Sequence, residues 1–298
     1  PGFLAVDEGK TVSITSISVS DPDVGAGLMM MNLTVTLGSF NLSQTTGLTF
    51  VVGNGVSDLD ARFTGTITDI NNALNGLSYA PQANFNGTTG FDLAIDDRGN
   101  TGSGGILSST ASTTFTVASV NDAPVLTVPG AQNVNEDTDL SMADLISVLD
   151  VDTGAGLVEV QLNVSSGTIT LGTTTGLTFS IGSGSSDADM KFQGTTSDIA
   201  SGFNTVVYHG DLHFNGLDTF GVYANDLGNS GSGGVLSDSQ IFNVTVNAVN
   251  DAPTAVSDAV TTPEDNPLSI DVLANDSDID SGDSVDSATL TIVSSPEN

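Results

Sequence analysis

The sequence has 298 residues, of which 36 are acidic and only 4 basic, giving a formal net charge of −32 at pH 7. So negative a surface repels nucleic acid and anionic membranes, because both need lysine and arginine to neutralise their phosphates. The sequence also lacks cysteine and any apolar run of about 18 residues, which excludes disulfides, zinc–thiolate sites and a membrane-spanning helix in this segment.

Apolar residues alternate with polar or small ones along several segments, a pattern typical of strands with one face on a core. In chain order the clearest of these segments are 29–37, 91–95, 158–164 and 242–246. Clusters of Gly, Asn, Asp and Ser separate the segments at the spacing of turns. Two short helices are predicted, with Thr68 or Ser197 as caps, at Asp69–Leu74 and Asp198–Phe203.

The second half of the sequence repeats the first. Residues 21–124 align with residues 150–253 without a gap, and nearly half of the aligned positions are identical. With about eight or nine strands in each copy, we predict an all-β chain of tandem antiparallel β-sandwich domains arranged end to end. The predicted domains are 1–121, 122–250 and 251–298, the last being the truncated start of a third repeat.

Each copy ends in the same five residues, Val-Asn-Asp-Ala-Pro, at 120–124 and 249–253. A proline fixes φ and removes a backbone donor, so this segment predicts a short, stiff connector rather than a flexible linker.

Acidic residues recur at matching positions of the two copies. The recurring motifs are an early Glu (Glu8; Glu136), Asp-x-Asp (Asp21, Asp23; Asp150, Asp152), a second Asp-x-Asp (Asp58, Asp60; Asp187, Asp189), an acidic turn (Asp97; Asp226) and the connector Asn-Asp (Asn121, Asp122; Asn250, Asp251). The third segment restarts the order with Asp278 and Asp280. Asp also favours turns, which explains any single pair. Recurrence in register favours Ca²⁺, which takes six to eight oxygen ligands.

The order of these motifs before Asn-Asp-Ala-Pro resembles the cadherin-like repeats of large bacterial surface adhesins, such as the extender regions of repeats-in-toxin adhesins. The resemblance implies an extracellular spacer on a bacterial surface whose partners are calcium ions and neighbouring repeats. It also implies that calcium at the first junction is bound by Glu8, Asp60, Asn121, Asp122, Asp150, Asp152 and Asp226. The set implied at the second junction is Glu136, Asp189, Asn250, Asp251, Asp278 and Asp280, with Asp21, Asp23 and Asp97 as further metal candidates in the first copy.

Other functions remain open at this point. A module that binds carbohydrate or another cell would use a patch that one copy lacks, and His209–His213 with Tyr208 and Tyr223 is the candidate. The two histidines replace Ala80 and Asn84 of the first copy, and we assign them to the surface rather than to a metal. A halophilic protein would spread its acids over strand faces and use more Glu than this sequence does. An enzyme is not expected, because active sites rarely recur in register along a chain.

Overall fold

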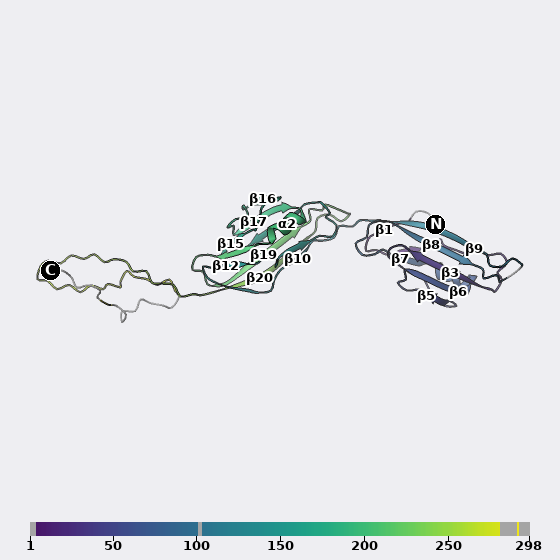
Figure 1. Cartoon of the computed structure of the whole chain (residues 1–298), viewed down its shortest axis with the longest axis horizontal. Coiled ribbons are helices and arrows are strands. Elements are labelled where there is room, and N and C mark those ends of the chain that lie inside the picture. Colours follow the sequence, from purple (N-terminus) through teal and green to yellow (C-terminus); the bar gives the residue numbers. More distant parts are fainter. Residues whose placement is uncertain (1–3, 101–102, 281–290, 292–298) are drawn as a thin grey trace. The chain divides into compact units, whose positions relative to one another are not determined.

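The computed structural model describes residues 4–100, 103–280 and 291 (Figure 1). The chain divides into two compact units. Unit 1 comprises Pro1–Val125, Leu149–Val158 and Asn225–Asp238, and unit 2 comprises Leu126–Val148, Glu159–Ala224 and Ser239–Asn298. Unit 1 therefore includes two loops that the sequence repeat assigns to the second copy. The predicted third repeat lies partly outside the described residues, and the predicted domain boundaries stay predictions.

The first copy is a β-sandwich of two sheets. Its described strands are β1 (Leu4–Asp7), β2 (Val12–Ile14), β3 (Leu28–Val35), β4 (Ser39–Asn41), β5 (Thr49–Val52), β6 (Asp60–Thr66), β7 (Leu77–Ala80), β8 (Gly87–Asp96) and β9 (Ser108–Ala118). One sheet has the order β1-β9-β8-β3-β6-β5 and the other the order β2-β7-β4.

The core of this sandwich lies between the two sheets. Along β3, every second side chain from Met29 to Val35 is buried, which confirms the alternation predicted there. Tyr79 of β7 and Phe115 of β9 are both fully buried, and their rings stack with centroids 4.4 Å apart. Burying aromatic rings of this size supplies a large share of the apolar area that stabilises a small sandwich.

The second copy repeats this arrangement. Its strands are β10 (Val125–Thr127), β11 (Gln132–Asn135), β12 (Asp139–Ser141), β13 (Ser147–Leu149), β14 (Val158–Asn163), β15 (Gly167–Thr170), β16 (Thr178–Ile181), β17 (Asp189–Gly194), β18 (Val207–Gly210), β19 (Gly216–Asn225) and β20 (Ser237–Asn247). The sheets have the orders β11-β20-β19-β14-β17-β16, β12-β18-β15 and β10-β13. The chain is therefore an all-β protein of tandem β-sandwiches.

One pairing in each copy differs from the predicted antiparallel pattern. β1 pairs with β9 in parallel, with Asp7 beside Ala118, and β11 pairs with β20 in parallel, with Asn135 beside Asn247. A parallel pair brings the ends of both strands to the same edge. The early Glu, which follows the first strand, therefore lies next to the connector, which follows the last strand.

The two predicted helices exist but begin earlier than predicted. They are α1 (Ile67–Leu74) and α2 (Thr196–Phe203). Their caps are Thr66 and Thr195, not Thr68 or Ser197, because each cap hydroxyl accepts a hydrogen bond from the backbone N–H of the residue three positions later.

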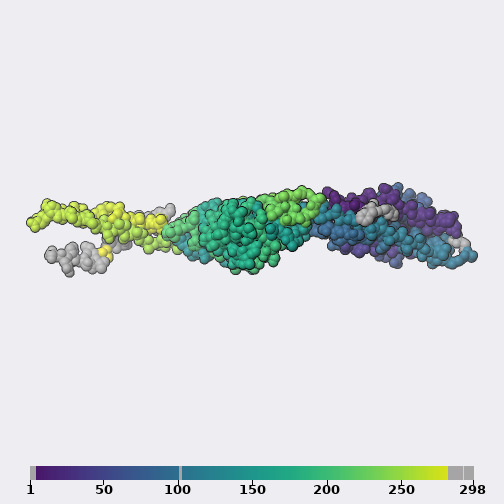
Figure 2. Space-filling model, turned by 90° about the horizontal axis from the view of Figure 1, so that it is seen from above, coloured from purple at the N-terminus to yellow at the C-terminus, as the bar shows by residue number. Residues whose placement is uncertain are grey.

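The described part of the third segment has no assigned strand of its own. Residues 254–280 are almost entirely exposed, and Figure 2 shows them (yellow-green) as a narrow stretch. Its one bridge joins Thr254 to Ser277 in antiparallel fashion. In the parts of the chain that the structure describes, no helix has the length and apolar character required to cross a bilayer.

Candidate metal centre

Six predicted ligand residues gather within unit 1 and are called cluster 1 from here on. They come from the end of β1, the connector after β9 and the two loops of the second copy that belong to this unit. The members of cluster 1 are Glu8, Asn121, Asp122, Asp150, Asp152 and Asp226.

Glu8 is fixed by the parallel pairing of β1 with β9. Its backbone N–H donates to the carbonyl of Ala118 (2.9 Å), and its Oε1 accepts from the backbone N–H of Val120 (2.9 Å). The side chain is only 8% exposed. The carboxylate is therefore anchored by one oxygen, and its other oxygen, Oε2, is buried without a hydrogen-bond partner.

The connector is held by the two loops. The backbone N–H of Asn121 donates to the carbonyl of Ser232 (2.9 Å), and the Asn121 amide donates to the carbonyl of Gly234 (2.9 Å) and to Asp226 Oδ2. The next backbone N–H, that of Asp122, donates to Asp152 Oδ2 (2.9 Å). These bonds bring the connector carboxylate beside the Asp-x-Asp motif.

Three buried carboxylate oxygens of cluster 1 have no hydrogen-bond partner: Glu8 Oε2, Asp150 Oδ2 and Asp152 Oδ1. Such atoms are rare in folded proteins, since burying an unpaired charge is costly. Burial raises the pKa of the Asp150 carboxyl group, and the adjacent Asp152 carboxylate raises it further. Glu8, Asp122 and Asp152 each offer an oxygen within 4.8 Å of the others. A hard divalent cation among these oxygens would supply the missing partner, so the residues fit calcium.

Asp226 is the best-anchored member of cluster 1. It is 1% exposed, and its Oδ1 accepts from the backbone N–H groups of Gly228 (2.8 Å) and Leu236 (2.9 Å). Its Oδ2 accepts from the Asn121 amide. Asp226 thus orients Asn121 while its own carboxylate is held by the loop backbone.

The same hydrogen bonds recur within unit 2, among residues called cluster 2: Glu136, Asn250, Asp251, Asp278 and Asp280. The backbone N–H of Val249 donates to Glu136 Oε1 (2.6 Å), and that of Asp251 donates to Asp280 Oδ2 (2.7 Å). Asp278 Oδ1 in turn accepts from the backbone N–H of Asp280 (3.0 Å). The structure therefore brings Glu136, Asp251, Asp278 and Asp280 of the predicted second set together in the same register. Asn250 is exposed, and its amide donates to the carbonyl of Asp251 (3.0 Å).

The predicted candidates of the first copy also lie together. Asp21, Asp23 and Asp97 line a hollow of about 320 Å³ with Met29 and Ile95. The neighbouring Asp21 carboxylate raises the pKa of Asp23, whereas backbone N–H groups hold the pKa of Asp97 below its usual value. This group corresponds to Asp150, Asp152 and Asp226 in the second copy.

Two predicted ligands do not lie in the clusters. Asp60, at the start of β6, is opposite Thr34, and the register continues through Asp92 to Ser112 of β9, six residues before Ala118. Asp60 therefore lies three strands away from β9 in the sheet, and it is also displaced along the strand direction from the end of β9, beside which Glu8 lies. Its inclusion in the first set is corrected. Asp189 at the start of β17 is corrected likewise: its Oδ1 accepts from Gln161 of β14 (2.8 Å), and two strands separate β17 from β20.

The patch considered for ligand binding is not an exposed platform. Tyr208 is fully buried, and its hydroxyl donates within the core to Asp218 Oδ2 (2.9 Å). His209 lies 2.9 Å from Asp139 through Nδ1. His213 is not simply a surface residue, because its ring contacts two carboxylates, those of Asp137 and Asp251.

Sequence reasoning missed Asp137 as a site residue. The signal was present, because Asp137 follows Glu136 where the first copy has Gly9 after Glu8. A new acid and a new histidine, both found only in the second copy, are consistent with a local site there.

Three comparisons with known proteins bear on this arrangement. Searching curated protein sequences gave no significant match. Solved structures that resemble the chain include human CDH23 EC21-23 (16% identity, 94% of this chain and 84% of that chain, TM-score 0.40). Others are mouse cadherin-23 EC22-24 (15%, 86% and 66%, TM-score 0.36) and human mucin-like protocadherin EC1-2 (14%, 83% and 96%, TM-score 0.32). Residues 250–298 match the family described as Bacterial Ig domain.

Proposed function

We propose that this chain is a calcium-rigidified extender segment of a large bacterial cell-surface adhesin, located outside the cell, with Ca²⁺ bound at clusters 1 and 2. The observation that carries the proposal is the set of buried, unpartnered oxygens on Glu8, Asp150 and Asp152. The similarity of residues 250–298 to a Bacterial Ig domain supports the bacterial, extracellular setting.

The charge balance supports a metal ion rather than a basic side chain as the partner of cluster 1. The ion pairs found among the described residues involve Lys191, His209 and His213, and none of them reaches cluster 1. Like charges this close repel one another when empty. Calcium turns that repulsion into attraction, and it binds the folded state in preference to the unfolded chain, which lacks the assembled site.

The proposed mechanism is a connector that calcium locks. Asp122 belongs to the connector, Glu8 follows the first strand, and Asp152 belongs to an Asp-x-Asp loop, so one ion would hold three separate segments. Without calcium, the repulsion among these carboxylates loosens the connector. A series of such locked connectors makes a stiff spacer that carries another part of the adhesin away from the cell surface. We expect no enzymatic activity from this segment.

Thermal unfolding in EGTA and in millimolar calcium, with small-angle X-ray scattering of the same samples, tests the proposal. We expect calcium to raise Tm and to give a longer, better-defined maximum dimension. Asp152→Asn keeps an acceptor for the Asp122 N–H but removes the charge, so its calcium response should shrink. Asp60→Asn, which removes one charge far from Glu8 in the sheet register, serves as the control and should respond like the wild type.

Two outcomes contradict the proposal. If calcium changes neither Tm nor the maximum dimension, the recurring acids are turn residues, and a direct binding function of the module moves ahead. If Asp60→Asn loses as much of the response as Asp152→Asn, the response reflects total charge rather than cluster 1.

A further inference from the structure

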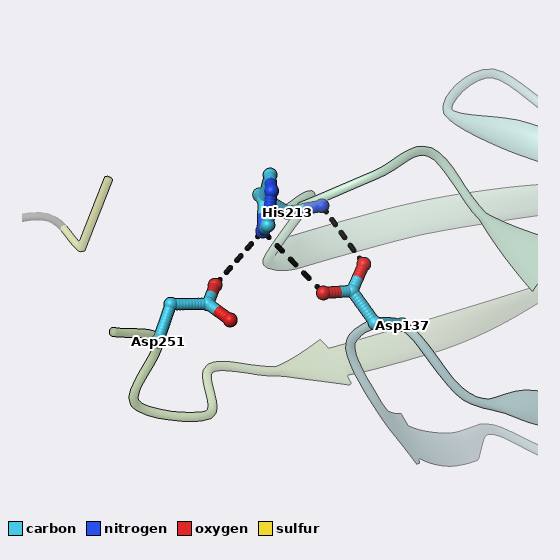
Figure 3. Close-up of side chains that lie close together, drawn as sticks. All are labelled: Asp137, His213 and Asp251. Atoms are coloured by element: carbon cyan, nitrogen blue, oxygen red, sulfur yellow. Dashed lines mark hydrogen bonds and ion pairs between the residues drawn. The ribbon is translucent and has the colours of Figure 1, made fainter. Parts of the chain in front are cut away.

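Three side chains of unit 2 converge from different segments, as Figure 3 shows. Asp137 follows β11, His213 lies in the turn between β18 and β19, and Asp251 follows β20. The Nδ1 atom of His213 lies 2.8 Å from Asp251 Oδ2 and 3.4 Å from Asp137 Oδ2. The backbone N–H of His213 also donates to Asp137 Oδ1 (3.0 Å).

The group exists in the second copy only. Matching strand registers place Asp137 at the position of Gly9, and the ungapped repeat places His213 at the position of Asn84. All four residues have positive φ, at 57° for Asp137, Asn84 and His213 and 69° for Gly9. The backbone is thus conserved between the copies, whereas two side chains able to bind a metal ion have been added to it.

We propose that Asp137, His213 and Asp251 form a mixed nitrogen–oxygen site for a divalent transition-metal ion such as Zn²⁺, distinct in chemistry from the all-oxygen cluster 1. Imidazole nitrogen suits zinc and its neighbours in the first transition row, whereas calcium selects oxygen. The ligand atoms of the three residues lie within 4.8 Å of one another.

The separations match those of a tetrahedral zinc site. Zinc–ligand bonds of about 2.0–2.1 Å place two ligands of a tetrahedron about 3.3 Å apart. The Nδ1–oxygen separations of 2.8 and 3.4 Å bracket this length, so little movement is needed to admit the ion. The side chains remain 29–34% exposed, which leaves an open position for water.

Two of the three ligands are already oriented. The backbone N–H of His213 holds the carboxylate of Asp137, and Asp251 is positioned by its own backbone N–H, which donates to Asp280 Oδ2 (2.7 Å). Such outer contacts fix ligand orientation in metal sites. The alternative role of the group is a plain ion pair, with a protonated imidazole between two carboxylates.

Asp251 also belongs to cluster 2, but the zinc proposal does not rest on calcium binding there, so it is tested in the full chain with and without saturating calcium. Isothermal titration with Zn²⁺ is expected to give one site per chain under both conditions. His213→Asn and Asp137→Gly restore the residues of the first copy at the same backbone conformation, and each is expected to weaken zinc binding at least tenfold. His209→Asn, which removes the other histidine beside a single carboxylate, should bind zinc like the wild type.

A long-range ¹H–¹⁵N spectrum separates metal binding from a structural ion pair. Zinc is expected to shift the Nδ1 resonance of His213 and to leave that of His209 in place. Zinc affinity unchanged in His213→Asn, or no shift at His213 Nδ1, would overturn the proposal and leave the ion pair. Melting curves in EDTA establish that the variants are folded, so a lost site is not mistaken for lost structure.

Discussion

At the scale of single residues, Asp150 shows that burial and a neighbouring carboxylate both disfavour the charged form of an aspartate. Its pKa is raised by burial and by Asp152, so the folded state binds a proton more tightly than the unfolded chain does. Without calcium, stability therefore falls as the pH rises from the ordinary pKa of an aspartate through the raised value in the folded state. Above that window the ionised carboxylate remains a destabilising group.

The change in Tm caused by Asp150→Asn is therefore predicted to have opposite signs without and with calcium. In EGTA at pH 7, Asp150→Asn removes the buried charge and should raise Tm by roughly 2–4 °C, the shift that about 1 kcal/mol produces in a domain of this size. In millimolar calcium the same variant should melt below the wild type, because a ligand is lost. Differential scanning calorimetry under both conditions measures this. A variant that is less stable in both would show that Asp150 acts only through its hydrogen bonds.

Two buried tyrosines provide a matched comparison between the copies. Tyr79 and Tyr208 occupy the same position, but the Tyr208 hydroxyl donates to the buried carboxylate of Asp218, where the first copy has Thr89. Hydrogen bonds to charged groups contribute about 1.5–3 kcal/mol, against about 1 kcal/mol for neutral ones. Tyr208→Phe should therefore cost more stability than Tyr79→Phe in urea denaturation. Equal costs would mean that Asp218 is satisfied by its backbone donors alone.

At the scale of elements, the helix caps were predicted two residues too late. The Thr66 hydroxyl accepts from the backbone N–H of Asp69 (3.2 Å) and donates to its Oδ2 (2.6 Å). Thr66→Ala should lower the free energy of unfolding by about 1 kcal/mol, the usual cost of losing a cap. Thr68→Ala, at the exposed position first expected to be the cap, should be nearly neutral. Urea denaturation in saturating calcium measures both, and a reversed order would restore Thr68 as the cap.

The strands and most of the clusters could be predicted because their signals are local and repeated. Alternation identified the segment from Met29 to Val35 as a strand. The register of the repeat showed that acids recur at matching positions, and the resemblance to cadherin-like repeats implied that Glu8 and Asp152 are partners of the connector. Asp60 could not be excluded in this way, because its distance from Glu8 depends on which strands lie between them in the sheet. That order is a property of the folded chain and leaves no local pattern.

The group around His213 was missed for a related reason. Its three members lie in turns that are far apart in the sequence, and the parallel pairing of β11 with β20 brings two of them together. Sequence comparison between the copies contained the signal at Asp137, but only the fold shows that both substitutions face Asp251.

At the scale of the whole molecule, the net charge of −32 makes any cation stabilising to some degree. Bulk screening acts on all exposed charges alike and depends on ionic strength, with a Debye length of about 10 Å at 0.1 M. Assembled sites instead discriminate between ions of equal charge. Calcium accepts six to eight oxygens in a flexible shell, whereas magnesium requires a tight octahedron and keeps its water.

Melting in NaCl, MgCl₂ and CaCl₂ at one ionic strength therefore separates a halophilic surface from specific sites. We expect calcium to raise Tm well above magnesium, and magnesium to exceed sodium by less than calcium exceeds magnesium. Asp152→Asn and Asp280→Asn, in clusters 1 and 2, should each remove part of the calcium increment, and the two losses should add because the variants share no partner. The same Tm in all three salts would assign the acids to bulk screening, because screening of exposed carboxylates depends on ionic strength and does not discriminate between cations.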